Sequence, residues 1–205
     1  MNEGPDDDSA WVRIATDLSP AALIAFCRDG ERLLRINPMY EFEEWRSDAG
    51  GRPFMRVRNL SNGRMLETFV RIEPKPDGTR LVYESGLKAA TEFRVEPKAG
   101  DCAAGGAVRG AELIVTDVYS GTPKAEREAR IDEIDRSLVW WGQGLKRYLR
   151  YHARWSNFGP WAWYMRRVWL PMKPKARNIA FLLIVVTVFE LASGILILAA
   201  FALGL

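Results

Sequence analysis

The sequence predicts an α+β fold, in which an antiparallel sheet is followed by one long helix and then by a C-terminal transmembrane helix. Three observations predict it. Seven segments alternate apolar and polar residues between turn sequences, apolar residues at spacings of three and four run through residues 131–152, and the last 27 residues hold one ionisable group. A period of two indicates strands, and a period near 3.6 indicates a helix.

The first alternating segment, WVRIATDL at 11–18, precedes two short helices. Ser19 and Pro20 predict the first helix start, because serine caps a helix and proline fits its first position. ERLLRINP at 31–38 predicts a second helix that ends at its proline. Later strands are expected at 39–47, 53–60, 64–74, 79–86, 89–97 and 110–119. The Asn-Gly pair within LSNGR predicts a hairpin between two of them.

The last element before the membrane-type segment is a long helix predicted over residues 122–155. It begins with Thr-Pro and early acidic residues, as helix N-termini prefer. Gly142 and Gly144 interrupt its apolar stripe and are expected to permit a bend. The stripe consists of Ile131, Ile134, Leu138, Trp141, Leu145, Tyr148 and His152.

Charge is distributed unevenly along the chain. Residues 1–135 hold 19 basic and 25 acidic residues, a net charge of −6, whereas residues 136–189 hold ten basic residues and no acidic one. The positive charge lies beside the hydrophobic segment, where anionic lipid attracts it. We therefore expect membrane lipids and not nucleic acid as partners, since nucleic-acid binding requires a basic face on the folded domain itself.

The segment from residue 179 to residue 205 spans about 40 Å as a helix, enough to cross a bilayer. Four tryptophans and five basic residues precede it in residues 155–177, and this composition is typical of a membrane interface. The basic residues place the domain in the cytoplasm. The predicted interface residues are Trp155, Trp161, Trp163, Arg166, Arg167, Trp169, Lys173, Lys175 and Arg177. The predicted organisation is a disordered acidic N-terminus (1–10), a folded domain (11–154), an interface segment (155–177) and a single transmembrane helix (178–205).

Four residues of the hydrophobic segment form a short polar stripe. Thr187, Glu190, Ser193 and Gly194 fall on one helical face and are suited to pairing with another helix through hydrogen bonds and close packing. This predicts a membrane-protein partner. The alternative is an isolated, tolerated Glu190.

The sequence offers little for catalysis or metal binding. Cys27 and Cys102 form no CxxC motif, and His152, the single histidine, has no Cys or His neighbour. The loop GDCAAGGAVRG at 100–110 lacks the order of a phosphate loop or a dinucleotide turn, and we interpret it as a surface loop. We assign no catalytic residue, no metal and no cofactor.

The order of elements, with the phrases RINPMYEFEEW, YESGLKAATEFRVEP and DVYSGTP, resembles the START-like, or polyketide-cyclase-like (SRPBCC), helix-grip superfamily across about residues 11–154. The resemblance implies a curved antiparallel sheet around the long helix, with a cavity for a hydrophobic or amphipathic molecule between them. The closing WYMRRVWLPMKPKAR with its hydrophobic segment is similar to a membrane-anchored bacterial subgroup of uncharacterised members. This implies the bacterial inner membrane.

Alternation then selects candidate pocket residues, although each of them can equally fill a core. They are Tyr40, Phe42, Val57, Tyr83, Phe93, Val115, Asp117, Tyr119, Leu138 and Trp141. Tyr83, Asp117 and Tyr119 are the best candidates for a polar cluster that binds a ligand head group. The pattern nevertheless favours a solvent-facing Asp117 at a sheet edge. Glu41, Glu43 and Glu44 could suggest paired carboxylates, but Glu41 and Glu43 share one face of their strand, which is expected to face water.

Three functions remain open. The first is a membrane-anchored module that binds a lipid or isoprenoid ligand at the cytoplasmic face. The second is a non-enzymatic adaptor in a membrane complex, which predicts a filled core. The third is a cyclase- or hydrolase-type enzyme, which predicts loss of activity on Asp117→Asn.

Overall fold

The computed structural model describes residues 9–98, 110–120, 123 and 131–203, and it separates into two compact units, Met1–Pro171 and Met172–Leu205. The predictions for residues 1–8, for most of the loop at 100–110 with Cys102, and for the start of the long helix fall outside the described residues. Ser9 and Ala10 belong to the first strand, so the structured part begins two residues before the predicted start at Trp11.

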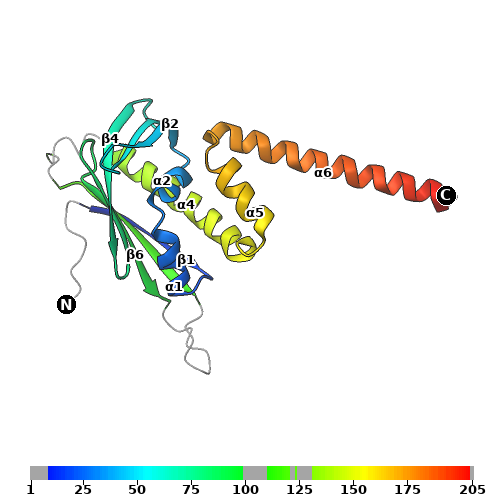
Figure 1. Ribbon diagram of the computed structural model, residues 1–205, viewed down its shortest axis with the longest axis horizontal. Helices are drawn as coiled ribbons and strands as arrows, with labels where there is room; N and C mark the ends of the chain where they lie inside the picture. The colour runs from blue at the N-terminus through cyan, green and yellow to red at the C-terminus, as the bar shows by residue number, and fades with distance from the viewer. Residues whose placement is uncertain (1–8, 99–109, 121–122, 124–130, 204–205) are drawn as a thin grey trace, which may run out of the picture. The chain divides into compact units, whose positions relative to one another are not determined.

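The first unit is built on a curved seven-stranded antiparallel sheet with the strand order β1-β7-β6-β5-β4-β3-β2 (Figure 1). The predicted strands are confirmed, with ends shifted by a few residues. The Asn-Gly turn joins the third and fourth strands, as predicted. The strands are β1 (Ser9–Thr16), β2 (Tyr40–Ser47), β3 (Pro53–Asn59), β4 (Met65–Lys75), β5 (Gly78–Tyr83), β6 (Ala90–Pro97) and β7 (Ala111–Val118).

Two short helices follow β1, as predicted. In α1 (Pro20–Cys27), the Ser19 hydroxyl accepts a hydrogen bond from the Ala22 N–H at 3.3 Å. In α2 (Gly30–Ile36), the Asp29 carboxylate accepts one from the Arg32 N–H at 3.0 Å. Both caps satisfy backbone donors that a helix start leaves unpaired.

The long helix α4 (Ile131–Trp155) packs on β1 and α2, and one hydrophobic core joins α1, α2 and α4 to the inner face of the sheet. The helix continues through Gly142 and Gly144. A Cβ on Gly144 would lie 3.1 Å from the Ile36 carbonyl oxygen, and one on Gly142 would lie 3.1 Å from a Val12 methyl carbon. These glycines therefore act as points of close approach between α4 and its neighbours.

The segment after α4 belongs to the same compact unit. It forms α5 (Gly159–Tyr164) and a π-helical segment η1 (Met165–Trp169), closed by a 3.0 Å bond from the Leu170 N–H to the Met165 carbonyl. Met165 and Leu170 are buried in the core cluster. The first unit thus continues past Arg154, where we expected the domain to end, because these side chains complete its core.

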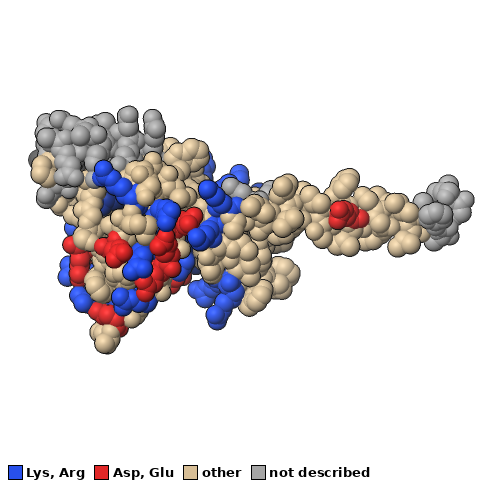
Figure 2. Space-filling view, turned by 90° about the horizontal axis from the view of Figure 1, so that it is seen from above, with Lys and Arg blue, Asp and Glu red and all other residues tan. Residues whose placement is uncertain are grey.

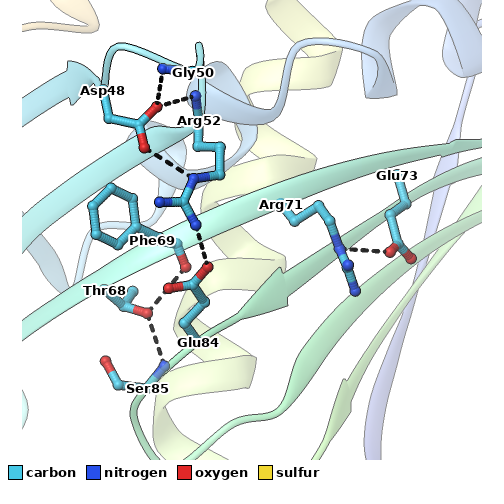
Figure 3. Close-up of polar contacts among 9 residues, drawn as sticks. All are labelled: Asp48, Gly50, Arg52, Thr68, Phe69, Arg71, Glu73, Glu84 and Ser85. Carbon is cyan, nitrogen blue, oxygen red and sulfur yellow. Dashed lines mark hydrogen bonds and ion pairs between the residues drawn. The ribbon is translucent and has the colours of Figure 1, made fainter.

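A network of polar contacts connects the turn after β2 with the residue that follows β5 (Figure 3). Asp48 accepts hydrogen bonds from the backbone of Gly50 and Arg52 and from the Arg52 side chain, which also pairs with Glu84 at 3.0 Å. The backbone bond from Arg52 is the largest of the effects that lower the pKa of Asp48. The β2–β3 turn is thereby joined to the end of β5.

The second unit contains α6 (Pro174–Leu203). Its stretch Pro174–Ala199, 26 residues, is long and apolar enough to cross a membrane. In Figure 2 the long apolar part of this helix shows one acidic group, in keeping with Glu190 as its single acidic residue. The predicted pairing residues, Thr187, Glu190, Ser193 and Gly194, all lie on α6, and their role stays a prediction.

Candidate ligand site: a buried lysine–aspartate cluster

The most unusual group of side chains in the sheet domain surrounds Asp117 of β7, which is fully buried. Its carboxylate pairs with the Lys88 ammonium and accepts a 2.6 Å hydrogen bond from the Thr91 hydroxyl. The Tyr119 hydroxyl lies 3.5 Å from the same carboxylate, and the Tyr83 hydroxyl donates to Thr91 at 3.1 Å. We call these five side chains the Lys88–Asp117 cluster.

Strand register brings the cluster together. Thr91 lies opposite Asp117 in the β6–β7 ladder, and Tyr83 ends β5. Lys88 comes from the turn between β5 and β6, where Gly86 has a φ of +121° that a side chain rarely tolerates. Two backbone bonds at Ala89 hold this turn in place, from Tyr83 N–H at 3.0 Å and to the Val118 carbonyl at 2.8 Å.

The surroundings of the cluster are apolar. The Lys88 nitrogen lies 5.4 Å from the ring centre of Trp141, whose own edge-to-face partner is Phe93 at 5.4 Å. Trp141 is completely buried and donates its indole N–H to the Leu33 carbonyl at 3.0 Å. The cluster is therefore a charged group set within the core between sheet and α4.

Burial and pairing decide the protonation states. Burial lowers the pKa of Lys88, but the Asp117 carboxylate and the neighbouring Tyr40, Tyr119 and Tyr83 together raise it well above its usual value. Burial raises the pKa of both Tyr83 and Tyr119. At neutral pH the cluster thus holds an ammonium ion and two uncharged phenols.

This arrangement suits the recognition of a polar head group on an apolar molecule. An ammonium ion has three donors, and one of those of Lys88 is directed at Asp117. A ligand hydroxyl, carbonyl or carboxylate that reached the cluster would meet Lys88 and Tyr83, two half-buried residues. Its apolar body would contact the core side chains around Trp141.

The structure places Tyr83, Asp117 and Tyr119 in one cluster, and their role in ligand binding stays a prediction. The favoured solvent-facing Asp117 was wrong, because β1 covers the outer edge of β7 and the side chain lies on the core face. Of the other predicted pocket residues, Phe42 is half-buried and the rest are buried: Tyr40, Val57, Phe93, Val115, Leu138 and Trp141.

Sequence reasoning missed Lys88. It lies in a turn, where no periodicity indicates which way a side chain faces, and only the β6–β7 register brings it beside Asp117. Glu43 of β2 is exposed, as expected. Glu43 pairs with Arg58 at 3.2 Å and Glu44 with Arg46 at 2.8 Å, next to an irregularity in the β2–β3 register.

The predicted interface tryptophans divide into two groups. Trp155 and Trp163 are exposed, whereas Trp161 and Trp169 pack against the core cluster. Arg166 and Arg167 are exposed. The three basic residues Lys173, Lys175 and Arg177 lie in the second unit, at the start of α6.

Other chemistry finds little support among the described residues. No group of three or more His, Cys, Asp and Glu side chains there is placed to hold a metal ion. Cys27 is buried, and burial raises its pKa to about 12, so that it stays an unreactive thiol.

The sheet order, the two short helices after β1 and the long helix α4 define a START-like helix-grip fold, as predicted. No family model and no curated protein matches the chain. Several solved structures are similar to this chain, and each match covers almost the full length of the solved structure. TTHA0849 from Thermus thermophilus is 15% identical, with 69% of this chain and 96% of that chain covered and a TM-score of 0.48. A START superfamily protein from Mycobacterium smegmatis is 15% identical (69% and 97% covered, TM-score 0.44), and XoxI from Bacillus cereus is 12% identical (66% and 94%, TM-score 0.43).

Proposed function

We propose that this chain is a membrane-anchored START-like module that binds one hydrophobic ligand, of lipid or isoprenoid type, between its sheet and α4 at the cytoplasmic face. The Lys88–Asp117 cluster would bind the ligand's polar end. The core side chains on both sides would contact its apolar body.

The buried ion pair is the observation that carries this proposal. Removing two charges from water costs more than their attraction commonly returns, so that apolar replacements of buried pairs are often neutral or stabilising. A polar ligand group that binds at the cluster gives the pair a function.

The composition of α6 supports the membrane part of the proposal. Lys173, Lys175 and Arg177 lie at the N-terminal end of its apolar stretch, and basic residues beside a span favour the cytoplasmic side. An anchor keeps the domain near the bilayer and raises the effective concentration of a membrane-derived ligand.

The enzyme alternative has weaker support. The oxygens of Asp117 already contact Lys88, Thr91 and Tyr119, so the carboxylate is engaged by internal partners rather than directed at a substrate. A general acid or base must instead reach the proton that it transfers.

The test compares the full-length chain with the double variant Lys88→Met/Asp117→Leu, which replaces the ion pair by apolar side chains. Both proteins carry the same α6 and therefore the same surrounding bilayer lipids. We expect organic extraction and mass spectrometry to find one compound, near one per chain, that is enriched in the wild type and depleted in the variant. Identical lipid profiles from two folded proteins would refute the proposal.

A further inference from the structure

A second polar site lies in the first unit, away from the Lys88–Asp117 cluster. It is a cavity of about 50 Å³ where α2, α4 and the α5–η1 segment meet. Its polar and aromatic lining residues are Arg32, Tyr148, His152, Ser156, Trp161 and Arg166.

Arg32 is the buried cation of this cavity, with 9% of its surface exposed. Its guanidinium stacks on Phe26 at 4.1 Å and donates through Nη2 to the Phe26 carbonyl at 2.6 Å. Among the described residues, no atom accepts a hydrogen bond from Arg32 Nε, since Asp29 Oδ2 lies 3.6 Å away. A buried charged donor without an acceptor requires an explanation.

The charges around the cavity do not balance. Asp29 Oδ2 lies 3.9 Å from Arg166 and 3.6 Å from Arg32, so that one carboxylate forms ion pairs with two guanidinium groups. Its other oxygen accepts the backbone N–H of Arg32. Of the described residues that line the cavity, none is acidic. The site therefore carries an excess of positive charge.

His152 adds a donor without adding charge. Its ring packs 5.3 Å from that of Phe26 and stacks on Tyr148 at 6.1 Å. Burial is the main cause that lowers its pKa, and Arg32 and Arg166 lower it further, so that the imidazole is neutral at neutral pH. A neutral imidazole still offers one N–H.

We propose that this cavity binds one phosphoryl group, which Arg32, Arg166, His152 and Ser156 would contact. Donors on three different elements suit an anion with several oxygens, and guanidinium groups match phosphate geometry well. The cavity is far smaller than the roughly 300 Å³ of a pocket for a whole small molecule, so the remainder of the ligand would lie outside it. This proposal does not depend on ligand binding between sheet and α4.

The same chemistry occurs in an anionic phospholipid head group and in a free phosphate ion. Trp155 and Trp163 are exposed on α4 and α5, the elements that supply His152 and Trp161. Exposed tryptophans are typical of segments that contact lipid head groups. The experiment therefore tests both sources.

His152 is the single histidine of the chain, which makes it a site-specific reporter. The full-length protein, labelled at histidine Cε1 with carbon-13, is placed in phosphatidylcholine nanodiscs. Inorganic phosphate is titrated in one arm, at constant ionic strength. Phosphatidic acid replaces part of the phosphatidylcholine in the other arm. The Arg166→Gln and Arg167→Gln variants remove the same charge one residue apart, and both residues are exposed, so that both variants are expected to fold.

We expect a saturable shift of the His152 signal and a raised His152 pKa, because a bound anion offsets the two guanidinium groups. Arg166→Gln should weaken binding about tenfold, since it removes a charge-assisted bond, and Arg167→Gln by less than about threefold. A shift in the lipid arm alone identifies a head group, and a shift with phosphate alone identifies a soluble phosphoryl compound. No shift in either arm, or equal losses in the two variants, would overturn the proposal.

Discussion

At the scale of single residues, Lys88 and Asp117 form an ion pair within the core of the domain. Asp117 is fully buried, and 12% of the Lys88 side chain is exposed. Each charge depends on the other, because a lone charge in the core has lost its hydration without compensation. The pair is therefore coupled in stability even where its net contribution is small.

A double-mutant cycle measures this coupling. Lys88→Met should lower the free energy of unfolding by about 3–5 kcal/mol, because it leaves Asp117 unpaired, and adding Asp117→Leu should recover most of the loss. Urea unfolding monitored by tryptophan fluorescence gives the free energy of unfolding of each variant. The exposed pair Arg71–Glu73 (Figure 3) serves as the control, since Arg71→Met should cost less than about 1 kcal/mol. Additive losses at Lys88 and Asp117 would contradict the coupling.

The cluster also predicts alkaline sensitivity. The pKa values of Lys88, Tyr83 and Tyr119 are all raised in the folded state, so their contribution to stability is complete below about pH 10, where the unfolded groups titrate. It is lost as pH rises further, because the unfolded chain releases these protons first. Unfolding free energies measured from neutral to alkaline pH should show this decline. In the variant Tyr83→Phe/Tyr119→Phe the decline should be shallower, and an unchanged slope would argue against buried phenols.

The sequence indicated three members of this cluster, Tyr83, Asp117 and Tyr119, but not Lys88 or Thr91. Alternation puts Asp117 on the same face of its strand as Val115 and Tyr119, which made it a candidate. Its burial depends on β1 pairing with β7, a contact between residues about a hundred positions apart. Lys88 depends on a turn conformation. Arg32 was missed because it interrupts a short helix whose other inward residues are apolar.

At the scale of elements, regular patterns were the reliable guide. Alternation with turn residues predicted the seven strands, and the stripe of apolar residues predicted α4, because both periods follow directly from backbone geometry. The π-helical segment η1 and the register irregularity in β2 could not be predicted. Neither is marked by a periodic pattern of apolar residues.

The β4–β5 hairpin contains a position where only glycine fits. A Cβ on Gly78 would lie 1.8 Å from the Phe93 carbonyl oxygen, which is backbone and cannot rotate away. Gly78→Ala should therefore destabilise the domain by about 2–3 kcal/mol through forced strand separation. Gly159→Ala is the matched control, because an added Cβ there meets nothing within 4 Å. Thermal unfolding should give a lower midpoint for Gly78→Ala than for Gly159→Ala. Equal midpoints would contradict this packing.

At the scale of the whole molecule, the chain joins a folded domain to a helix suited to a bilayer. Composition alone indicated that division, since residues 136–177 lack acidic residues and the apolar stretch follows them. The predicted membrane-protein partner of this helix stays a prediction.

Glu190 is the position to test for such a partner. If Thr187, Glu190, Ser193 and Gly194 form a pairing face, Glu190→Leu should weaken association of full-length chains about threefold or more, through loss of an interhelical hydrogen bond. Energy transfer between labelled chains in vesicles reports the association. Leu191→Ala, on a neighbouring face, should change it little. Unaltered transfer in Glu190→Leu would leave Glu190 as an isolated, tolerated residue.

The measurement that tests the ligand-binding proposal most directly is native mass spectrometry of the full-length chain released from nanodiscs. Collisional activation removes loosely held bilayer lipids, whereas a ligand enclosed between sheet and α4 should be retained. We predict one retained adduct per chain in the wild type and its absence in the Lys88→Met/Asp117→Leu variant. A wild-type chain that loses every adduct as readily as the variant would contradict ligand binding at the Lys88–Asp117 cluster.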